Sequence, residues 1–226
     1  MRLYFAGPPC FAGRLFPLLM AGRRVLASFP NLGRSIYARR EAFEGTALDC
    51  GAFSTPGRPA VRPEDYFAHL ERSGEGYDWY TSLDVIGDVR ASLAFFREMR
   101  RRGLRPVPVF HSGEPWSVLE EYAALSPLVG LGSSPGEGRR KRRAWFEEVM
   151  ARYPHRYHLF RATDPALVAG LAAESCDSSS WARAAAMGFA PGPGGRRVYA
   201  PRKSAFERAA AWVRYFESAV PLWAAS

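Results

Sequence analysis

The sequence has few cysteines, and they are widely spaced. Only Cys10, Cys50 and Cys176 occur in 226 residues, and no two of them form a Cys-x-x-Cys pair. Three scattered thiols cannot build a disulfide framework, and their spacing offers no zinc ligand set. We therefore expect a protein of a reducing, cytoplasmic compartment. We expect no metal and no other cofactor.

Long apolar runs are also missing. The apolar stretch at residues 11–20 is interrupted by Gly13, Arg14 and Pro17, and it is too short to cross a bilayer. The sequence shows no signal peptide, lipidation motif, low-complexity tract or sequence-level repeat. These absences predict a protein without a membrane partner.

The sequence is instead rich in arginine. Its net charge is +9 and its pI is about 9.9, and arginine strongly outnumbers lysine. Guanidinium groups pair bidentately with phosphate, so nucleic acid is the leading partner class. The 47% hydrophobic and 14% aromatic content is enough for the core of one large domain or two small ones.

Short apolar or β-branched segments recur along the chain and predict eight strands. The segments between them have helical spacing, as at residues 90–103 and 116–125, and prolines such as Pro63 mark helix starts. The expected strands cover residues 3–6, 25–29, 46–48, 79–83, 107–110, 128–131, 157–160 and 174–176. This βα rhythm predicts a compact α/β protein, a (β/α)8 TIM barrel, with an open doubly wound sheet as the structural alternative.

The region after the eighth unit differs in composition. Residues 191–204 are too rich in proline and glycine for a helix, and they precede an amphipathic helix expected over residues 205–220. We therefore predict a single domain over residues 1–226, in which a barrel (residues 1–190) is followed by a Pro/Gly/Arg linker and a C-terminal helix. The oligomeric state stays open.

Polar residues follow several predicted strands, where a barrel of this kind has its active site. Asp49, Asp84 and Asp177 occupy such positions, so three carboxylates are expected on one rim. An aspartate after a strand is also a frequent N-cap of the next helix. Capping accounts well for Asp88 and is open for Asp177. It accounts poorly for Asp84, because Asp88 can cap that helix, and for Asp49, because no helix is expected directly after it. His111 fits a structural role as well as a ligand contact.

Several short motifs resemble those of the tRNA-guanine transglycosylases, in the queuine/archaeosine tRNA-ribosyltransferase superfamily. In chain order they are "LDCGAFS" (48–54, a DSGGFQ-type loop), "SLDVIGD" (82–88, the guanine-recognising aspartate segment), "VFHSGEP" (109–115, the position of a Gln-Gly-Gly stretch), "VGLGSS" (129–134, a Gly-rich base-contact loop) and "ESCDSSSW" (174–181, the strand end with the nucleophilic aspartate). Their order and rough spacing agree across residues 46–181. The compact phage and bacterial relatives that insert 7-deazaguanines into DNA are the most similar in character.

This resemblance implies an enzyme that exchanges guanine in nucleic acid for a 7-deazaguanine base such as preQ0. Asp177 would be the nucleophile that attacks C1′ and forms a covalent glycosyl-enzyme intermediate, and Asp49 would be the general acid/base. Asp84 would accept hydrogen bonds from guanine and so discriminate against adenine. The other implied base-binding residues are Cys50, Phe53, His111, Gly130, Leu131 and Gly132.

Two departures from the family affect the expected substrate. The tRNA enzymes carry a Cys-rich zinc subdomain near the C-terminus, whereas no cysteine follows Cys176 here. Zinc is therefore not expected, and DNA is favoured over tRNA as the polymer. Cys50 and Ala52 stand where the relatives have Ser or Gly, which affects the detailed contacts of that loop.

Two basic clusters are candidate nucleic-acid contacts. The first lies at the start of a predicted helix, where a bound phosphate would offset the unfavourable helix dipole, although a solvated helix face explains it equally well. The second lies in the linker and is interleaved with Tyr199, which suits backbone binding with stacking. The first contains Arg139, Arg140, Lys141, Arg142 and Arg143, and the second contains Arg196, Arg197, Arg202 and Lys203.

Other functions are compatible with the same residues. The same base exchange on tRNA would use the same site. A hydrolytic N-glycosidase would leave the basic surface unused, and a non-catalytic nucleic-acid-binding module would not need the three aspartates to face one cavity.

Overall fold

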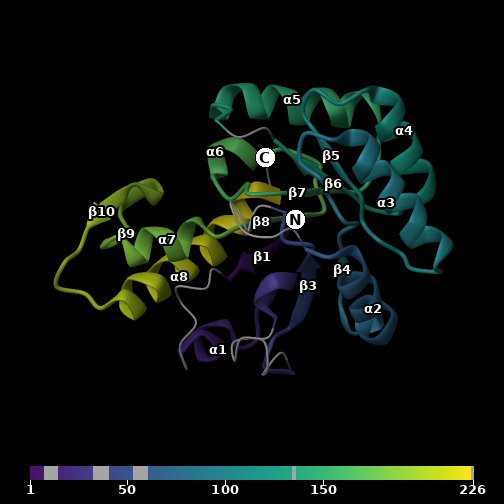
Figure 1. Ribbon diagram of the computed structural model, residues 1–226. Helices are drawn as coiled ribbons and strands as arrows, with labels where there is room; N and C mark the ends of the chain where they lie inside the picture. Colours follow the sequence, from purple (N-terminus) through teal and green to yellow (C-terminus); the bar gives the residue numbers. More distant parts are fainter. Residues whose placement is uncertain (8–14, 33–40, 53–60, 134–135, 225–226) are drawn as a thin grey trace.

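The computed structural model describes residues 1–7, 15–32, 41–52, 61–133 and 136–224 (Figure 1). Eight strands form one parallel, curled sheet in the order β4-β3-β2-β1-β8-β7-β6-β5. They are β1 (Arg2–Ala6), β2 (Arg24–Ser28), β3 (Gly45–Asp49), β4 (Trp79–Tyr80), β5 (Val109–His111), β6 (Val129–Gly132), β7 (Tyr157–Leu159) and β8 (Ser175–Ser178). The eight predicted strands are therefore confirmed, with shifted ends.

A single bridge joins the segments beside the two outermost strands. Thr81 pairs in parallel with Val107, just after β4 and just before β5. The Ser82 N–H donates to the Val107 carbonyl, and the Val107 N–H donates to the Tyr80 carbonyl, both at 2.8 Å. β4 contains Trp79 and Tyr80, the two residues that pair with Ala47 and Leu48 of β3.

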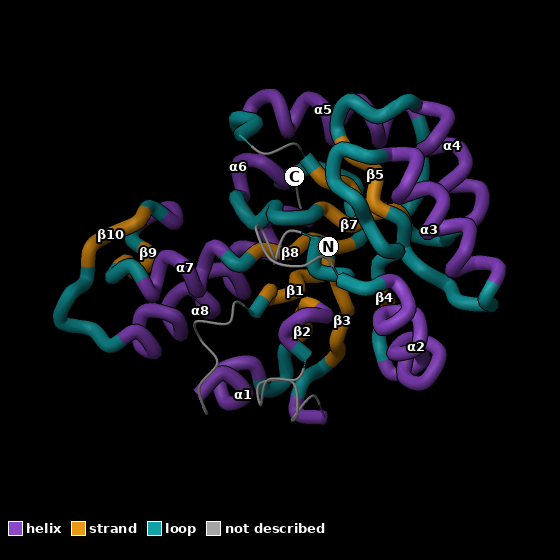
Figure 2. The backbone as a smooth tube through the Cα atoms, in the orientation of Figure 1, coloured by secondary structure: helices purple, strands orange, loops and turns teal. Residues whose placement is uncertain are grey.

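Helices follow most of the strands and lie outside the curled sheet (Figure 2). They are α1 (Leu15–Met20), α2 (Pro63–Ser73), α3 (Val89–Arg101), α4 (Trp116–Leu125), α5 (Arg139–Arg152), α6 (Pro165–Val168), α7 (Ser180–Ala186) and α8 (Ala205–Ala224), with 3-10 turns at Phe29–Asn31, Gly74–Gly76 and Pro193–Gly195. Asp88 caps α3 as predicted: its Oδ1 accepts the Ala91 N–H at 3.0 Å. None of the helices in the described ranges combines the length and the apolar character that crossing a bilayer requires.

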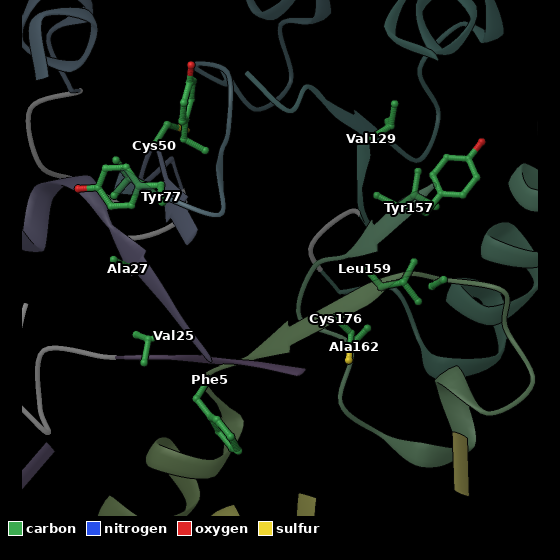
Figure 3. Packing of buried hydrophobic residues seen from close by; sticks show 14 of the residues in the cluster. Phe5, Val25, Ala27, Cys50, Tyr77, Val129, Tyr157, Leu159, Ala162 and Cys176 are labelled. Atoms are coloured by element: carbon green, nitrogen blue, oxygen red, sulfur yellow. The ribbon is translucent and has the colours of Figure 1, made fainter. Parts of the chain in front are cut away.

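Each strand buries two different faces. Phe5, Leu48 and Cys176 belong to the main core between sheet and helices, part of which Figure 3 shows. Tyr4 and Ala47 pack on the concave face with Trp79 and Phe160. Because strand side chains alternate between faces, Asp49 and Asp177 are on the concave face, two residues after Ala47 and one after Cys176.

The region expected as a linker is folded. β9 (Phe189–Pro191) and β10 (Arg197–Tyr199) form an antiparallel hairpin, which Figure 1 shows at the left, apart from the eight-stranded sheet. The composition excluded a helix correctly, but the hairpin depends on α8: the Trp212 Nε1–H donates to the Phe189 carbonyl at 3.0 Å. The predicted C-terminal helix is confirmed as α8.

Candidate active site

Asp177 lies inside β8, and only 3% of the residue is exposed. Its Oδ1 accepts the backbone N–H of Arg161 at 3.0 Å and lies 3.3 Å from Nε2 of His158. The N-cap of α7 is Ser179, so the capping interpretation that the sequence left open for Asp177 is wrong. A buried carboxylate with this geometry is fixed in orientation through one oxygen.

His158 connects Asp177 to the interior of the sheet. The imidazole is completely buried, its Nδ1 lies 2.8 Å from Ser175 Oγ, and its ring centroid lies 4.6 Å from those of Trp79 and Phe160. His158 was not among the predicted site residues. The alternation Tyr-His-Leu over β7 could have predicted its position, because a residue between two core residues of a strand faces the opposite side of the sheet.

Arg161 supplies its N–H to Asp177 from an unusual conformation. Its φ is 56°, and it is the only non-glycine residue with a positive φ among the described residues. This backbone conformation is unfavourable for a residue that carries a Cβ. The guanidinium of Arg142 fastens this turn, because Nη2 donates to the carbonyls of Phe160 at 3.3 Å and Arg161 at 3.2 Å. Burial lowers the pKa of Arg142 below its ordinary value.

Asp49 is the last residue of β3. Its Oδ2 accepts the Gly51 N–H at 3.2 Å, and Gly51 has φ +93° with the Pro30 ring 2.4 Å from where a Cβ would be, so only glycine fits this turn. Burial, followed by the charges of Asp177 and Asp84, raises the pKa of Asp49 to about 7. Asp49 therefore lies close enough to Asp177 and Asp84 for both charges to act on its carboxyl group.

Asp84 and His111 form a direct pair at the same end of the sheet. Oδ2 of Asp84 lies 2.8 Å from Nε2 of His111, and Oδ1 accepts the Ser92 hydroxyl at 3.0 Å. Burial lowers the pKa of His111, but the hydrogen bond and the charge of Asp84 outweigh it, and the pKa is raised overall. Each carboxylate oxygen keeps a further lone pair for a ligand.

The other predicted base-binding residues have packing roles. A Cβ on Gly130 would be 2.5 Å from the Phe160 ring, and one on Gly132 would be 2.6 Å from the His111 ring. The side chains of Leu131 and Cys50 point into the main core, where burial raises the pKa of the Cys50 thiol. These residues could therefore contact a base through their backbone atoms only. Phe53 and Cys10 lie outside the described residues.

The first basic cluster is mostly used within the protein. Arg139 pairs with Asp164 at 3.1 Å, Lys141 pairs with Glu137 at 3.2 Å, and Arg143 pairs with Glu147 at 2.9 Å and donates to the carbonyls of Leu167 and Ala169. Arg140 makes no such contact in the described part of the chain. The residues of the second cluster are exposed. In the described ranges, no group of three or more His, Cys, Asp or Glu side chains could hold a metal ion.

No protein-family model matches the sequence, and no curated protein matches it. A putative fructose-1,6-biphosphate aldolase from Coccidioides immitis is similar in structure, with a TM-score of 0.55, 10% identity, and 97% of this chain and 91% of that chain covered. Two Rhizobium etli structures have TM-scores of 0.51: pyruvate carboxylase T882A (10% identity, 99% of this chain, 28% of that chain) and the carboxyl transferase domain with pyruvate and biocytin (12%, 99% and 48%). At such identities the likeness shows the fold alone.

Proposed function

We propose that this protein is a base-exchange transglycosylase that replaces guanine in nucleic acid with a 7-deazaguanine base, on DNA in preference to tRNA. The observation that carries the proposal is the arrangement of Asp177, Asp49 and Asp84. These carboxylates share one end of the parallel sheet, and Asp177 is held by two donors through a single oxygen. No helix cap explains Asp49 or Asp177.

The architecture in this proposal is a (β/α)8 barrel. The Thr81–Val107 bridge would close it between β4 and β5. In such barrels the active site lies at the carboxyl ends of the strands, where β3 ends in Asp49 and β8 contains Asp177.

The free oxygen of Asp177 is the nucleophile in this mechanism. Oδ1 carries both hydrogen bonds, and Oδ2 accepts none within the described residues. Oδ2 attacks C1′ as the C1′–N9 bond breaks, and the electron pair of that bond stays on N9 of guanine. A carboxylate ester at C1′ divides one difficult displacement into two easier ones.

Asp49 transfers the protons of both half-reactions. With a pKa near 7 it is partly protonated at neutral pH, so it can donate a proton to the departing guanine N9. The resulting carboxylate then takes the N9 proton of the incoming base, whose N9 attacks C1′ and releases Asp177. The proton count is restored after one cycle.

Asp84 selects the base. Its remaining lone pairs accept N1–H and the exocyclic amine of guanine, while His111 holds Oδ2 in place. Adenine would leave the carboxylate unpaired, which costs about 1–3 kcal/mol for each buried group without a partner.

The names of the structural neighbours raise carbonyl chemistry as an alternative. A Schiff-base mechanism needs a lysine in the site, and the chain has two lysines, Lys141 and Lys203. The Lys141 side chain is 77% exposed and pairs with Glu137, and Lys203 is exposed in the loop after β10. Neither is therefore a candidate for a Schiff base in this site.

Isotope incorporation tests this proposal. The protein is incubated with labelled guanine or preQ0 and with duplex DNA, single-stranded DNA or bulk tRNA, as wild type, Asp177→Asn and the exposed control Asp65→Asn. We expect label in DNA with wild type and Asp65→Asn, and none with Asp177→Asn. Label in tRNA alone would show that tRNA, and not DNA, is the substrate. Release of guanine without incorporation would indicate a hydrolase. An unchanged nucleic acid in every incubation would overturn the proposal.

A further inference from the structure

The charged side chains of the hairpin arm, residues 187–204, are all basic. No acidic residue occurs between positions 178 and 206. The basic side chains of this stretch are exposed and make no ion pair or hydrogen bond within the part of the chain that the structure describes. They are Arg196, Arg197, Arg202 and Lys203 of the arm, and Arg183 of the preceding helix α7. On α5, by contrast, four of the five clustered basic residues have intramolecular partners.

The arm also exposes aromatic and apolar side chains. Tyr199 is 65% exposed, and its neighbour Val198 is 48% exposed. The Tyr199 ring packs edge-on to Phe189, with centroids 5.8 Å apart, and lies over Gly188, where a Cβ would be 2.8 Å from the ring. The Tyr199 ring is thus held in place by Phe189 and Gly188, and its exposed surface is open to a ligand.

The arm is fixed in place. Arg208 of α8 donates from Nε to the Ala185 carbonyl at 2.7 Å and from Nη1 to the Ala200 carbonyl at 3.3 Å. The Ala200 N–H donates to the Gly188 carbonyl at 2.9 Å, which closes the base of the arm. A rigid, preorganised surface loses less conformational entropy on binding than a loose loop.

We propose that the arm is a nucleic-acid-binding surface, with Arg196, Arg197, Arg202 and Lys203 on backbone phosphates and Tyr199 stacked on an unpaired base. Unpaired arginines without acidic neighbours match a polyanion, and an aromatic face stacks on any base. This inference rests on the proposed function for the identity of the polymer. The target nucleotide must leave a duplex for C1′ to be reached, so a substrate of the proposed function contains unpaired nucleotides.

Fluorescence anisotropy over a salt series tests the arm. The probes are a labelled 20-nucleotide single strand, the corresponding duplex and a tRNA. The variants are Arg196→Gln/Arg197→Gln, Tyr199→Ala and Tyr199→Phe, with Arg100→Gln/Arg105→Gln as the control of equal charge change. Arg100 and Arg105 are exposed, without an ion pair among the described residues, and line a cavity at the amino ends of the strands.

The expected changes are specific to the arm. The arginine double variant should lower the slope of log K against log salt by about 1.4 on the single strand, because two phosphate contacts are lost. Tyr199→Ala should weaken single-strand binding about fivefold or more, and Tyr199→Phe should bind as wild type. Wild-type slope and affinity in the arm variants, or an equal loss in the control, would overturn the inference.

This outcome is separable from base exchange. If the arm variants lose binding while no label enters any nucleic acid, the arm proposal stands and the proposed function fails. If label enters DNA while the arm variants bind as wild type, the reverse holds.

Discussion

Oδ1 of Asp177 and Nε2 of His158 lie 3.3 Å apart, with 4% of the Asp177 side chain exposed and none of the His158 side chain. This contact and the Arg161 N–H occupy the same oxygen, so the two oxygens of one carboxylate differ in their partners. The difference gives Asp177 a fixed attacking direction in the proposed mechanism.

Replacing His158 tests this orientation. His158→Phe keeps a ring between Trp79 and Phe160 but removes both hydrogen bonds. We expect the turnover rate to fall about tenfold or more, because a hydrogen bond to a charged group contributes about 1.5–3 kcal/mol, with little change in KM. His155→Phe, at a residue whose Nε2 contacts the Ser126 carbonyl and whose ring packs edge-on to Tyr157, is the control, and equal losses in both variants would contradict the positioning role.

Asp49 should make stability depend on pH in a defined direction. Its pKa is about 7 in the folded protein against 3.8 ordinarily, so the folded state holds more protons between these values. Stability is therefore lost as pH rises from about 4 to 7. Urea unfolding should show that Asp49→Asn is more stable than the wild type at pH 8, and that the difference disappears near pH 4. The Asp49→Asn variant should be inactive at both pH values. A pH-independent difference would contradict this account.

Arg142 should affect catalysis and not phosphate binding. Arg142→Gln leaves the carbonyls of Phe160 and Arg161 without their donor, loosening the turn that holds Asp177. We expect a lower turnover rate and an unchanged salt dependence of nucleic-acid binding. Arg90→Gln, at an exposed arginine of α3 that forms no ion pair within the described residues, should leave the turnover rate unchanged. A reduced salt slope for Arg142→Gln would restore the phosphate interpretation.

Gly132 should be required for base selection. A Cβ there would be 2.6 Å from the His111 ring, so Gly132→Ala should displace His111 and disturb its pairing with Asp84. We expect KM for the incoming base to rise several-fold. Gly138→Ala is the matched change, because nothing lies within 4 Å of its Cβ position. If both variants bind the base equally well, His111 has no part in recognition.

The strands could be predicted because each is a short apolar run buried on a sheet. The ends of the strands could not be predicted, and the end of β8 decides whether Asp177 is a helix cap or a strand residue of the site. The sequence "DSSSW" is good capping chemistry after a strand that stops at Cys176, but β8 continues to Ser178. The extension depends on pairing with β1, where Tyr4 opposes Asp177, a contact between distant parts of the chain.

The residues that position Asp177 could not be predicted from local sequence patterns, because their roles also depend on contacts between distant parts of the chain. Arg142 occurs in a run of basic residues that looks uniform, and only the tertiary structure separates it from Arg140. The arm likewise depends on distant contacts: its composition predicted no helix, whereas the hairpin is held by Trp212 and Arg208 of α8.

The covalent intermediate tests the central claim most directly. The protein is mixed with a guanine-containing DNA oligonucleotide without an incoming base, denatured, and analysed by intact mass and peptide mapping. The account predicts a protein–DNA adduct that has lost guanine and maps to Asp177, absent from Asp177→Asn. An adduct on another residue, or base exchange that proceeds in Asp177→Asn, would contradict it.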